Sequence, residues 1–461
     1  MSVSTNQQNR EWDGVPMPNR IFAAAAVMLA VGMGVLDGVI INIALPTICD
    51  GLFVSASHSI WIVNAYQISV IVSLLPLSAL GDFVGYRKIY IGGICLFTLT
   101  SIGCALSWSF ASLVSFRVLQ GIGASAVMSI NTSIVRLIYP KRMLGRGLGF
   151  NSTIVSVSSV AGPTLAAALL AVAEWPLLFA VNIPIGIMAI VMGYRYIPQN
   201  PSLRQMDDFR WGDALMSILT FGLLFALITG VTHGVPWRLL LLEALLLVAV
   251  GYLFVRGQLL RSVPILPFDL LKIPIFSLSI LTSILSFIAQ MAVMVAMPFI
   301  LHRQFGYSTL EIGAIITAWP VVNLFASPVA GMLVDKFHAG VLGCIGLLVL
   351  TSGMALLAFM PSEPSTWEIM LRLAVCGLGF GFFQAPNNNI IISSAPLSRS
   401  GSASGMMATA RLTGQIVGAA AVAMLFYVVP DESLTNILYV GFATTALATI
   451  VSFSRLSLPL S

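Results

Sequence analysis

The chain of 461 residues is 58% hydrophobic and only 8% charged, and its formal net charge is +5. A soluble domain carries about 25% charged residues, so this composition excludes a soluble globular protein and indicates a polytopic protein of the lipid bilayer. The basic residues stand singly between apolar runs, which argues against a nucleic-acid partner.

Fourteen apolar runs are long enough to cross a membrane as helices, which requires about 20 residues each. In chain order they cover 21–46, 59–80, 89–108, 112–134, 147–171, 176–197, 212–232, 237–256, 275–301, 311–333, 340–360, 369–392, 404–428 and 436–454. The polar segment before the first run lacks the pattern of a cleaved signal peptide, so the first run is expected to be retained as a span. The predicted fold class is an all-α polytopic membrane protein with both termini on one side.

Lysine and arginine are distributed unevenly between the two sets of loops. The tails and every second loop hold 17 of them, and the opposite loops hold only Arg238 and Arg303. Three further arginines, Arg117, Arg372 and Arg411, lie within spans. Because positively charged loops stay in the cytoplasm, we expect both termini to be cytoplasmic and the chain to lie in the inner (plasma) membrane.

The two ends of the chain are related by a shift of roughly 255 residues. At this shift Arg117 faces Arg372, and Asp82 faces Asp335. The matches run in the same direction, so the repeats are parallel. Parallel six-helix halves with a site between them at mid-membrane are typical of alternating-access transporters.

The repeat predicts two six-helix bundles joined by a two-helix central hairpin. The expected parts are a cytoplasmic tail at 1–20, an N-terminal bundle at 21–200, a linker with the extra hairpin of spans 7 and 8 at 201–274, a C-terminal bundle at 275–454 and a cytoplasmic tail at 455–461.

Asp37 is the only charged residue in the apolar run from Ile21 to Ile48. A carboxylate in the membrane is costly and is a functional hypothesis by default. Asp37 could carry a proton by cycling between its neutral and charged forms, and it could attract a cationic substrate when ionised. The alternative interpretation is structural: Asp37 pairs with a neighbouring helix and locks the bundle.

Arg117 lies about five residues into span 4, which makes it the strongest partner candidate for proton transfer. The alternative is a side chain that snorkels to the outer interface. Arg372 lies near the end of its span, where an interfacial role is expected. For Arg411 in span 13 the expected role is packing or gating.

Polar and aromatic residues within spans are candidates for a transport cavity. The preferred substrate-binding residues are Asp37, Tyr66, Gln290 and Trp319, because aromatic faces hold organic cations and neighbouring methionines adapt to varied shapes. Core packing is the alternative for each of them.

Gly162 and Pro163 fall within span 5. Proline removes a backbone hydrogen bond and kinks a helix, and small residues let helices approach closely. We expect a break in the helix that serves as a hinge or as a tight interface between the halves, with a purely structural kink as the alternative.

The sequence carries no recognisable enzymatic machinery. It lacks a phosphate-binding loop of the GxxxxGK[ST] type, so an ion gradient is the expected energy source. Its five cysteines include no CxxC pair, and no disulfide framework, metal site or cofactor is expected. Small molecules and protons are the expected partners, without an obligate protein partner.

Four stretches resemble motifs of one family, the major facilitator superfamily. "SALGDFVGYRK" (78–88) resembles its loop 2–3 motif, "LVSFRVLQGIGAS" (113–125) its span 4 motif, and "SSVAGPTLAA" (158–167) its span 5 antiporter motif. "LDGVIINIALP" (36–46) resembles the span 1 motif of its fourteen-span drug:proton antiporter family, with Gly38 in place of a threonine.

The resemblance implies roles for further residues. Asp82, Gly85 and Arg87 would form a latch that binds the other half in the outward-facing state, and Gly85 would allow the turn. The alternative for these residues is helix capping and topology. The span 4 arginine, here Arg117, is implicated in proton coupling in this superfamily.

The resemblance favours a proton-coupled efflux antiporter that exports lipophilic cations such as quaternary ammonium compounds and dyes. Export of a specific metabolite, such as an amino acid or an organic acid, is the alternative, because few acidic residues lie at mid-membrane. A membrane sensor without transport activity is a further alternative, although such a protein should carry a soluble output domain.

Overall fold

The computed structural model describes residues 14–54, 56–200, 209–232, 235–261, 264–307, 309–361, 363–428 and 433–457, and the secondary structure within these ranges is entirely helical. Most of the expected N-terminal tail, part of the central linker and the last four residues therefore lie outside the described residues.

The helices follow the order of the predicted spans. The N-terminal half contains α1 (Asn19–Leu52), α2 (Ala56–Val84), α3 (Tyr86–Ala105), α4 (Phe110–Ile138), α5 (Leu144–Val172), α6 (Leu177–Ala180) and α7 (Asn182–Tyr196). The middle of the chain contains α8 (Trp211–Thr232), α9 (Trp237–Leu259) and α10 (Phe268–Leu271). The C-terminal half contains α11 (Pro274–Arg303), α12 (Thr309–Ile316), α13 (Ala318–Val334), α14 (Ala339–Ala358), α15 (Thr366–Ser394), α16 (Ser400–Val428) and α17 (Ser433–Ser454).

The start of α4 and the start of α15 are built in the same way. Ser109 accepts a hydrogen bond from the backbone of Ser112, whose side chain accepts one in return, and Ser365 and Glu368 do the same at α15. Such a capping box satisfies backbone donors that a helix start leaves free. The two helices occupy equivalent places in the repeat, so the local signal repeats with the fold.

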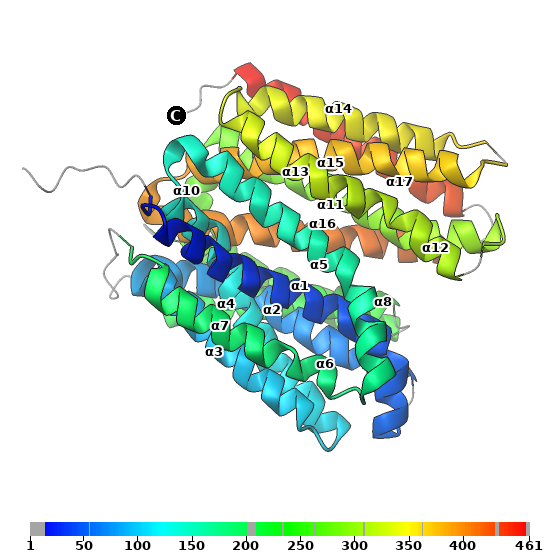
Figure 1. The fold of residues 1–461 in the computed structure, drawn as a ribbon, viewed down its shortest axis with the longest axis horizontal. Helices are drawn as coiled ribbons and strands as arrows, with labels where there is room; N and C mark the ends of the chain where they lie inside the picture. Colours follow the sequence, from blue (N-terminus) through cyan, green and yellow to red (C-terminus); the bar gives the residue numbers. More distant parts are fainter. Residues whose placement is uncertain are drawn as a thin grey trace, which may run out of the picture.

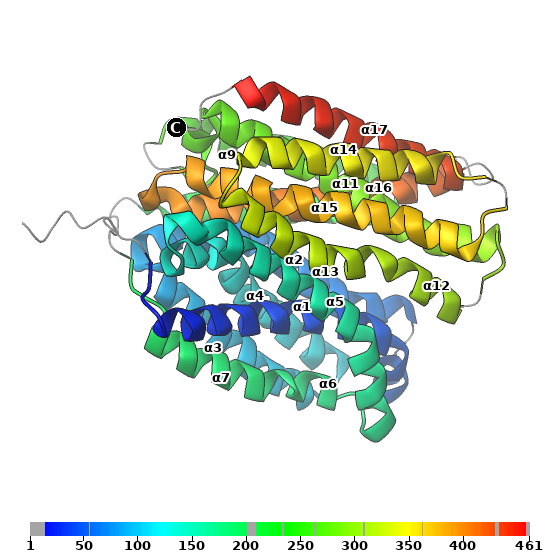
Figure 2. The same cartoon turned by 45° about the horizontal axis from the view of Figure 1, so that its top comes forward.

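The two halves lie side by side, and their helices run roughly parallel to the long axis of the molecule (Figure 1). The blue-to-green helices α1–α4, α6 and α7 form one side, and the yellow-to-red helices α13–α17 form the other. The helices of one half meet those of the other where α5 packs against α13 and where α16 packs against α2 and α4. The start of α1 and the end of α17 lie at the same end of the molecule in both views (Figure 2), which we call the terminal end.

The central hairpin is a peripheral element. α8 packs against α9 and against α2, and α9 exposes much of its apolar surface, including Leu241, Leu245 and Val248. Apolar side chains that face outward along a helix of this length are expected to face lipid.

Twelve of the helices in the described residues are long and apolar enough to cross a membrane. The helices α5 and α16, of 29 residues each, are not among these twelve. The chain is therefore a multi-pass membrane protein with an all-helical fold, and the count of fourteen spans stays a prediction.

Candidate functional site

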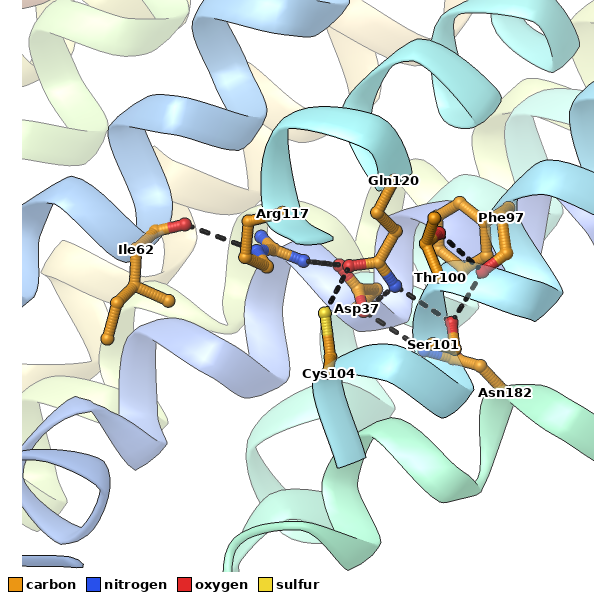
Figure 3. A network of polar contacts seen from close by, with 9 residues as sticks. All are labelled: Asp37, Ile62, Phe97, Thr100, Ser101, Cys104, Arg117, Gln120 and Asn182. Carbon is orange, nitrogen blue, oxygen red and sulfur yellow. Dashed lines mark hydrogen bonds and ion pairs between the residues drawn. The ribbon is translucent and has the colours of Figure 1, made fainter. Parts of the chain in front are cut away.

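A buried ion pair joins α1 to α4 in the N-terminal half. Nη1 of Arg117 donates to Oδ2 of Asp37 at 2.6 Å, and each side chain is only 1% exposed. Figure 3 shows the two side chains pointing toward each other between their helices. A buried charge of either sign is costly on its own, so each residue supplies the partner that the other requires.

Amide groups from two further positions complete the surroundings of the carboxylate. Nε2 of Gln120 donates to Oδ1 of Asp37 at 3.2 Å, and Nδ2 of Asn182 donates to the same oxygen at 3.0 Å. Gln120 also donates to Oγ of Ser101 at 2.9 Å (Figure 3). Asp37 thus accepts hydrogen bonds from α4 and α7, and the bonds of these side chains connect the four helices α1, α3, α4 and α7.

The arginine is held just as firmly as the carboxylate. Its Nε donates to the backbone oxygen of Ile62 at 3.1 Å, and its Nη1 donates to Oε1 of Gln120 at 2.7 Å. The centre of the Arg117 guanidinium lies 4.1 Å from the centre of the Tyr66 ring, a distance at which a cation is attracted to the face of the ring.

A cavity of about 550 Å³ lies between the two halves. This volume is typical of sites for drug-sized ligands. Among the described lining residues, each half contributes three amide side chains, which are Gln67, Asn131 and Asn151 from the N-terminal half and Gln384, Asn388 and Gln415 from the C-terminal half. Methionines and phenylalanines, among them Met291 and Phe287, supply much of the apolar wall.

Tyr66 connects the cavity to the ion pair, because it lines the cavity and its ring covers Arg117. Asp37 itself is not among the lining residues, and Arg411 of α16 is the single charged residue among the described residues that line the cavity. Tyr66 of the cavity wall therefore lies against Arg117, the partner of the predicted proton carrier.

Gln290 and Trp319 do not line this cavity either. Trp319 is 1% exposed, and its ring centre lies 6.0 Å from that of Phe380 in the core of the C-terminal half. Of the four predicted substrate-binding residues, Tyr66 alone lines the cavity in this conformation, and the substrate contacts of all four stay predictions.

At the terminal end, Asp82 at the end of α2 contacts the first residues of α16 in the other half. Its Oδ1 accepts a hydrogen bond from the backbone N–H of Gly401 at 2.9 Å, and its Oδ2 accepts one from the Ser402 hydroxyl at 2.6 Å. The hydroxyl of Tyr86 donates to the same carboxylate at 2.7 Å. A carboxylate at a helix N-terminus is favoured by the free N–H groups and the helix dipole.

Asp335, the repeat equivalent of Asp82, makes the matching contact in the opposite direction. Its Oδ1 accepts a hydrogen bond from the backbone N–H of Gly145 at 3.1 Å, and its Oδ2 lies 3.2 Å from Nε of Arg146, both near the start of α5. Burial raises the pKa of Asp335, while these two neighbours lower it. Two carboxylates thus join the halves at this end, each at the start of a helix in the other half.

The remaining predicted gating residues lie within the N-terminal half. Gly85 has φ +105° at the start of α3, a conformation that favours glycine. Arg87 stays within its own half, where it donates to the backbone oxygen of Tyr194 and lies 4.9 Å from that ring. Their gating roles stay predictions.

The helix is not interrupted in span 5, because α5 runs as one helix from Leu144 to Val172, and the expected hinge at Gly162 and Pro163 stays a prediction. Membrane helices tolerate proline when neighbouring groups satisfy the freed backbone atoms. Gly162 instead marks a close approach to α1, since a Cβ there would lie 2.6 Å from Cγ1 of Val39. The side chain of Pro163 lies outside the described residues.

Sequence reasoning assigned no role to Gln120 and did not consider Asn182. Gln120 stands one helical turn after Arg117, which places both on one face of α4. Asn182 is a lone amide in the apolar run of span 6, and this isolation is the signal that could have pointed to it.

The sequence matches the description Major Facilitator Superfamily over residues 22–419, and a second match covers residues 279–459, within the C-terminal half. The chain belongs to the major facilitator superfamily. The family and the fold are those of transporters, single-chain membrane proteins that handle small molecules. The second match agrees with the internal repeat.

Several characterised and uncharacterised transporters resemble this superfamily member over most of their length. It is 46% identical to the uncharacterized transporter YebQ of Escherichia coli K12, over 97% of this chain and 98% of the relative. It is 28% identical to the riboflavin transporter RibZ of Clostridioides difficile (86% and 85%) and 29% identical to the multidrug resistance protein Stp of Mycobacterium tuberculosis (85% and 74%).

A solved structure supports the same fold. The proton:xylose symporter XylE superposes with a TM-score of 0.70 over 95% of this chain and 96% of that chain, at 16% identity. At this identity the likeness concerns the fold alone.

Proposed function

We propose that this superfamily member is a proton-coupled efflux antiporter of the fourteen-span drug:proton antiporter type, which exports small organic molecules by alternating access. It would lie in the inner (plasma) membrane with both termini, and hence the terminal end, in the cytoplasm. The observation that carries the proposal is the buried pair of Asp37 and Arg117 at 2.6 Å, which lies behind a wall residue of the central cavity, Tyr66.

The network suggests how a proton would be coupled to movement. Protonation of Asp37 removes the negative charge that holds the Arg117 guanidinium and converts one acceptor oxygen into a donor. Arg117 would then lose its counter-charge, and the hydrogen bonds of Gln120 and Asn182 to the carboxylate would have to rearrange. Because this carboxylate links α1 to both α4 and α7, the proton would change how these helices pack.

The contacts at the terminal end would supply the gate. Asp82 and Asp335 contact the starts of α16 and α5 in the opposite half. With the terminal end in the cytoplasm as proposed, this structure would correspond to a state closed toward the cytoplasm. Opening of the same end would require both carboxylates to leave their helix starts. Alternating access needs such contacts, which form in one state and break in the other.

Two classes of substrate are candidates, drugs and specific metabolites. Similarity to a multidrug resistance protein favours drug export, and similarity to a riboflavin transporter favours a specific metabolite. The ion pair of Asp37 with Arg117 favours the second candidate, export of a metabolite such as an organic acid, because a cationic drug would have to compete with Arg117 for the carboxylate.

The test is substrate-evoked proton movement in proteoliposomes with a pH-sensitive dye in the lumen. The panel would contain lipophilic cations and amphipathic carboxylates. We expect proton flux with the wild type and its loss in Asp37→Asn. The matched control is Asp213→Asn, because Asp213 also pairs with an arginine, Arg261 at 3.2 Å, but lies on α8 away from the cavity. Unchanged proton flux in Asp37→Asn would show that another residue carries the coupled proton.

A further inference from the structure

We infer that the central cavity takes amphipathic organic anions and that Arg411 holds their anionic group. This inference rests on the proposed export function and names its substrate class. It departs from the expectation of lipophilic cations, and it follows from the charge of the lining, the position of Arg411 on its helix and the repeat.

The part of the lining that the structure describes carries a single formal charge, and that charge is positive. No aspartate or glutamate is among the described residues that line the cavity, and Arg411 is the one charged side chain. Asp37, the carboxylate of the nearest network, is already paired with Arg117 and accepts two amide hydrogen bonds. A cation would therefore meet an uncompensated guanidinium in this cavity, whereas an anion would meet its counter-charge.

The guanidinium of Arg411 lacks the partners that the other central arginine has. Its Nε is buried without a hydrogen-bond partner among the described residues, in contrast to Nε of Arg117, which donates to Ile62. Buried polar groups in proteins are almost always paired, so each exception calls for an explanation. A bound carboxylate supplies what is missing, since guanidinium groups bind carboxylates with two parallel hydrogen bonds.

The position of Arg411 excludes an interfacial side chain. A rise of 1.5 Å per residue puts it about 16 Å along α16 from Ser400, close to the middle of a hydrocarbon core of about 30 Å. Charged residues at this depth are rare and line substrate or ion pathways. We therefore infer that Arg411 binds substrate, in place of the packing or gating role expected from the sequence.

The repeat shows that the fold itself does not require this arginine. The offset of 256 that matches Gly162 to Gly418 equates Arg411 with Val155, and both residues line the cavity. The N-terminal half thus has an aliphatic side chain at the position that Arg411 occupies in the C-terminal half. The remaining walls combine amides such as Gln384 and Asn388 with Met291 and Phe287, which suits a substrate with an apolar body and few polar groups.

Binding can be tested with probes that differ only in charge. The probes would be carboxylates built on several ring systems, such as naphthoate, together with the neutral amide and the trimethylammonium derivative of each ring. Thermal unfolding of the detergent-solubilised full chain reports binding without any need for transport. We expect the carboxylates to raise Tm more than the matched amides, and the ammonium derivatives to have the smallest effect.

Variants of Arg411 separate its charge from its bulk. Arg411→Gln should weaken carboxylate binding about tenfold or more and leave amide binding unchanged, because one charge-assisted contact is lost. Arg411→Lys should retain part of the preference for anions. The control is Arg372→Gln, since Arg372 also has buried nitrogens without partners among the described residues but does not line the cavity; its preference should equal that of the wild type.

The outcomes distinguish this inference from the proposed function. Stronger binding of the ammonium series, no response of the folded wild type to any carboxylate, or the same preference in Arg411→Gln as in the wild type would each overturn the inference, even if proton-coupled export is observed. An anion preference that depends on Arg411, together with substrate-evoked proton flux that persists in Asp37→Asn, would keep the substrate class and reject Asp37 as the coupling site.

Discussion

At the scale of single residues, the unusual feature is how completely the charge of Asp37 is compensated. The carboxylate receives an ion pair and two amide donors from residues far apart in the sequence. The two charged residues could be singled out from the sequence, because charges inside apolar runs are rare. The amides could not, because asparagine and glutamine occur in many spans and only packing decides which of them face the carboxylate.

The pair can be tested for energetic coupling by a double-mutant cycle. Removal of one partner of a buried pair leaves an uncompensated charge and costs about 3–5 kcal/mol, so Arg117→Gln should lower Tm strongly. The variant with both Asp37→Asn and Arg117→Gln contains no charge at this place and should be more stable than Arg117→Gln alone. Thermal unfolding in detergent measures all four proteins, and purely additive effects would contradict a direct interaction.

At the scale of elements, the closure of the terminal end depends on two helix starts that allow close approach. A Cβ at Gly401 would lie 2.5 Å from Oδ1 of Asp82, and one at Gly145 would lie 2.5 Å from the backbone oxygen of Gly331. The sequence predicted the helices, the turn at Gly85 and the repeat that equates Asp82 with Asp335. It did not indicate which helix start each carboxylate contacts, because that choice depends on how the two halves dock.

Gly401→Ala should therefore favour the conformation that is open at the terminal end. Overpacking of this kind costs about 1–3 kcal/mol, which corresponds to a population shift of roughly fivefold to a hundredfold. Spin labels at the exposed positions Lys88 and Leu397, one in each half, would report a longer distance in the variant.

The matched control for this glycine is Gly92→Ala, since a Cβ at Gly92 has no atom within 4 Å. Its distance distribution should equal that of the parent. If Gly401→Ala leaves the distribution unchanged as well, the contact of Asp82 with α16 does not hold the two halves together.

At the scale of the whole molecule, composition and the internal repeat were sufficient to predict an all-helical membrane protein of two related halves. The cavity was not predictable in the same way, because helices from both halves contribute to it and each places a different face toward it. Arg411 illustrates the difference: its sequence position indicates its depth, but only the packed structure shows that it faces a cavity whose described lining contains no acid.

The sign of the substrate charge also determines how transport responds to the membrane potential. If n protons enter for each molecule exported, an anion moves n + 1 positive charges inward, whereas a monovalent cation moves n − 1. The two cases differ by two charges, or about 4.6 kcal/mol at 100 mV. With one proton per substrate, cation export is electroneutral and anion export is driven by the potential.

Uptake into vesicles whose cytoplasmic face points outward makes this difference measurable. With the pH gradient held constant, a lumen-positive potential from valinomycin and external potassium should accelerate accumulation of a carboxylate substrate, and collapse of the potential should slow it. Asp37→Asn vesicles should show neither effect, because exchange with protons is lost. Transport that depends on the pH gradient but not on the potential would indicate electroneutral exchange, and such exchange requires a cation when one proton is coupled to each substrate molecule.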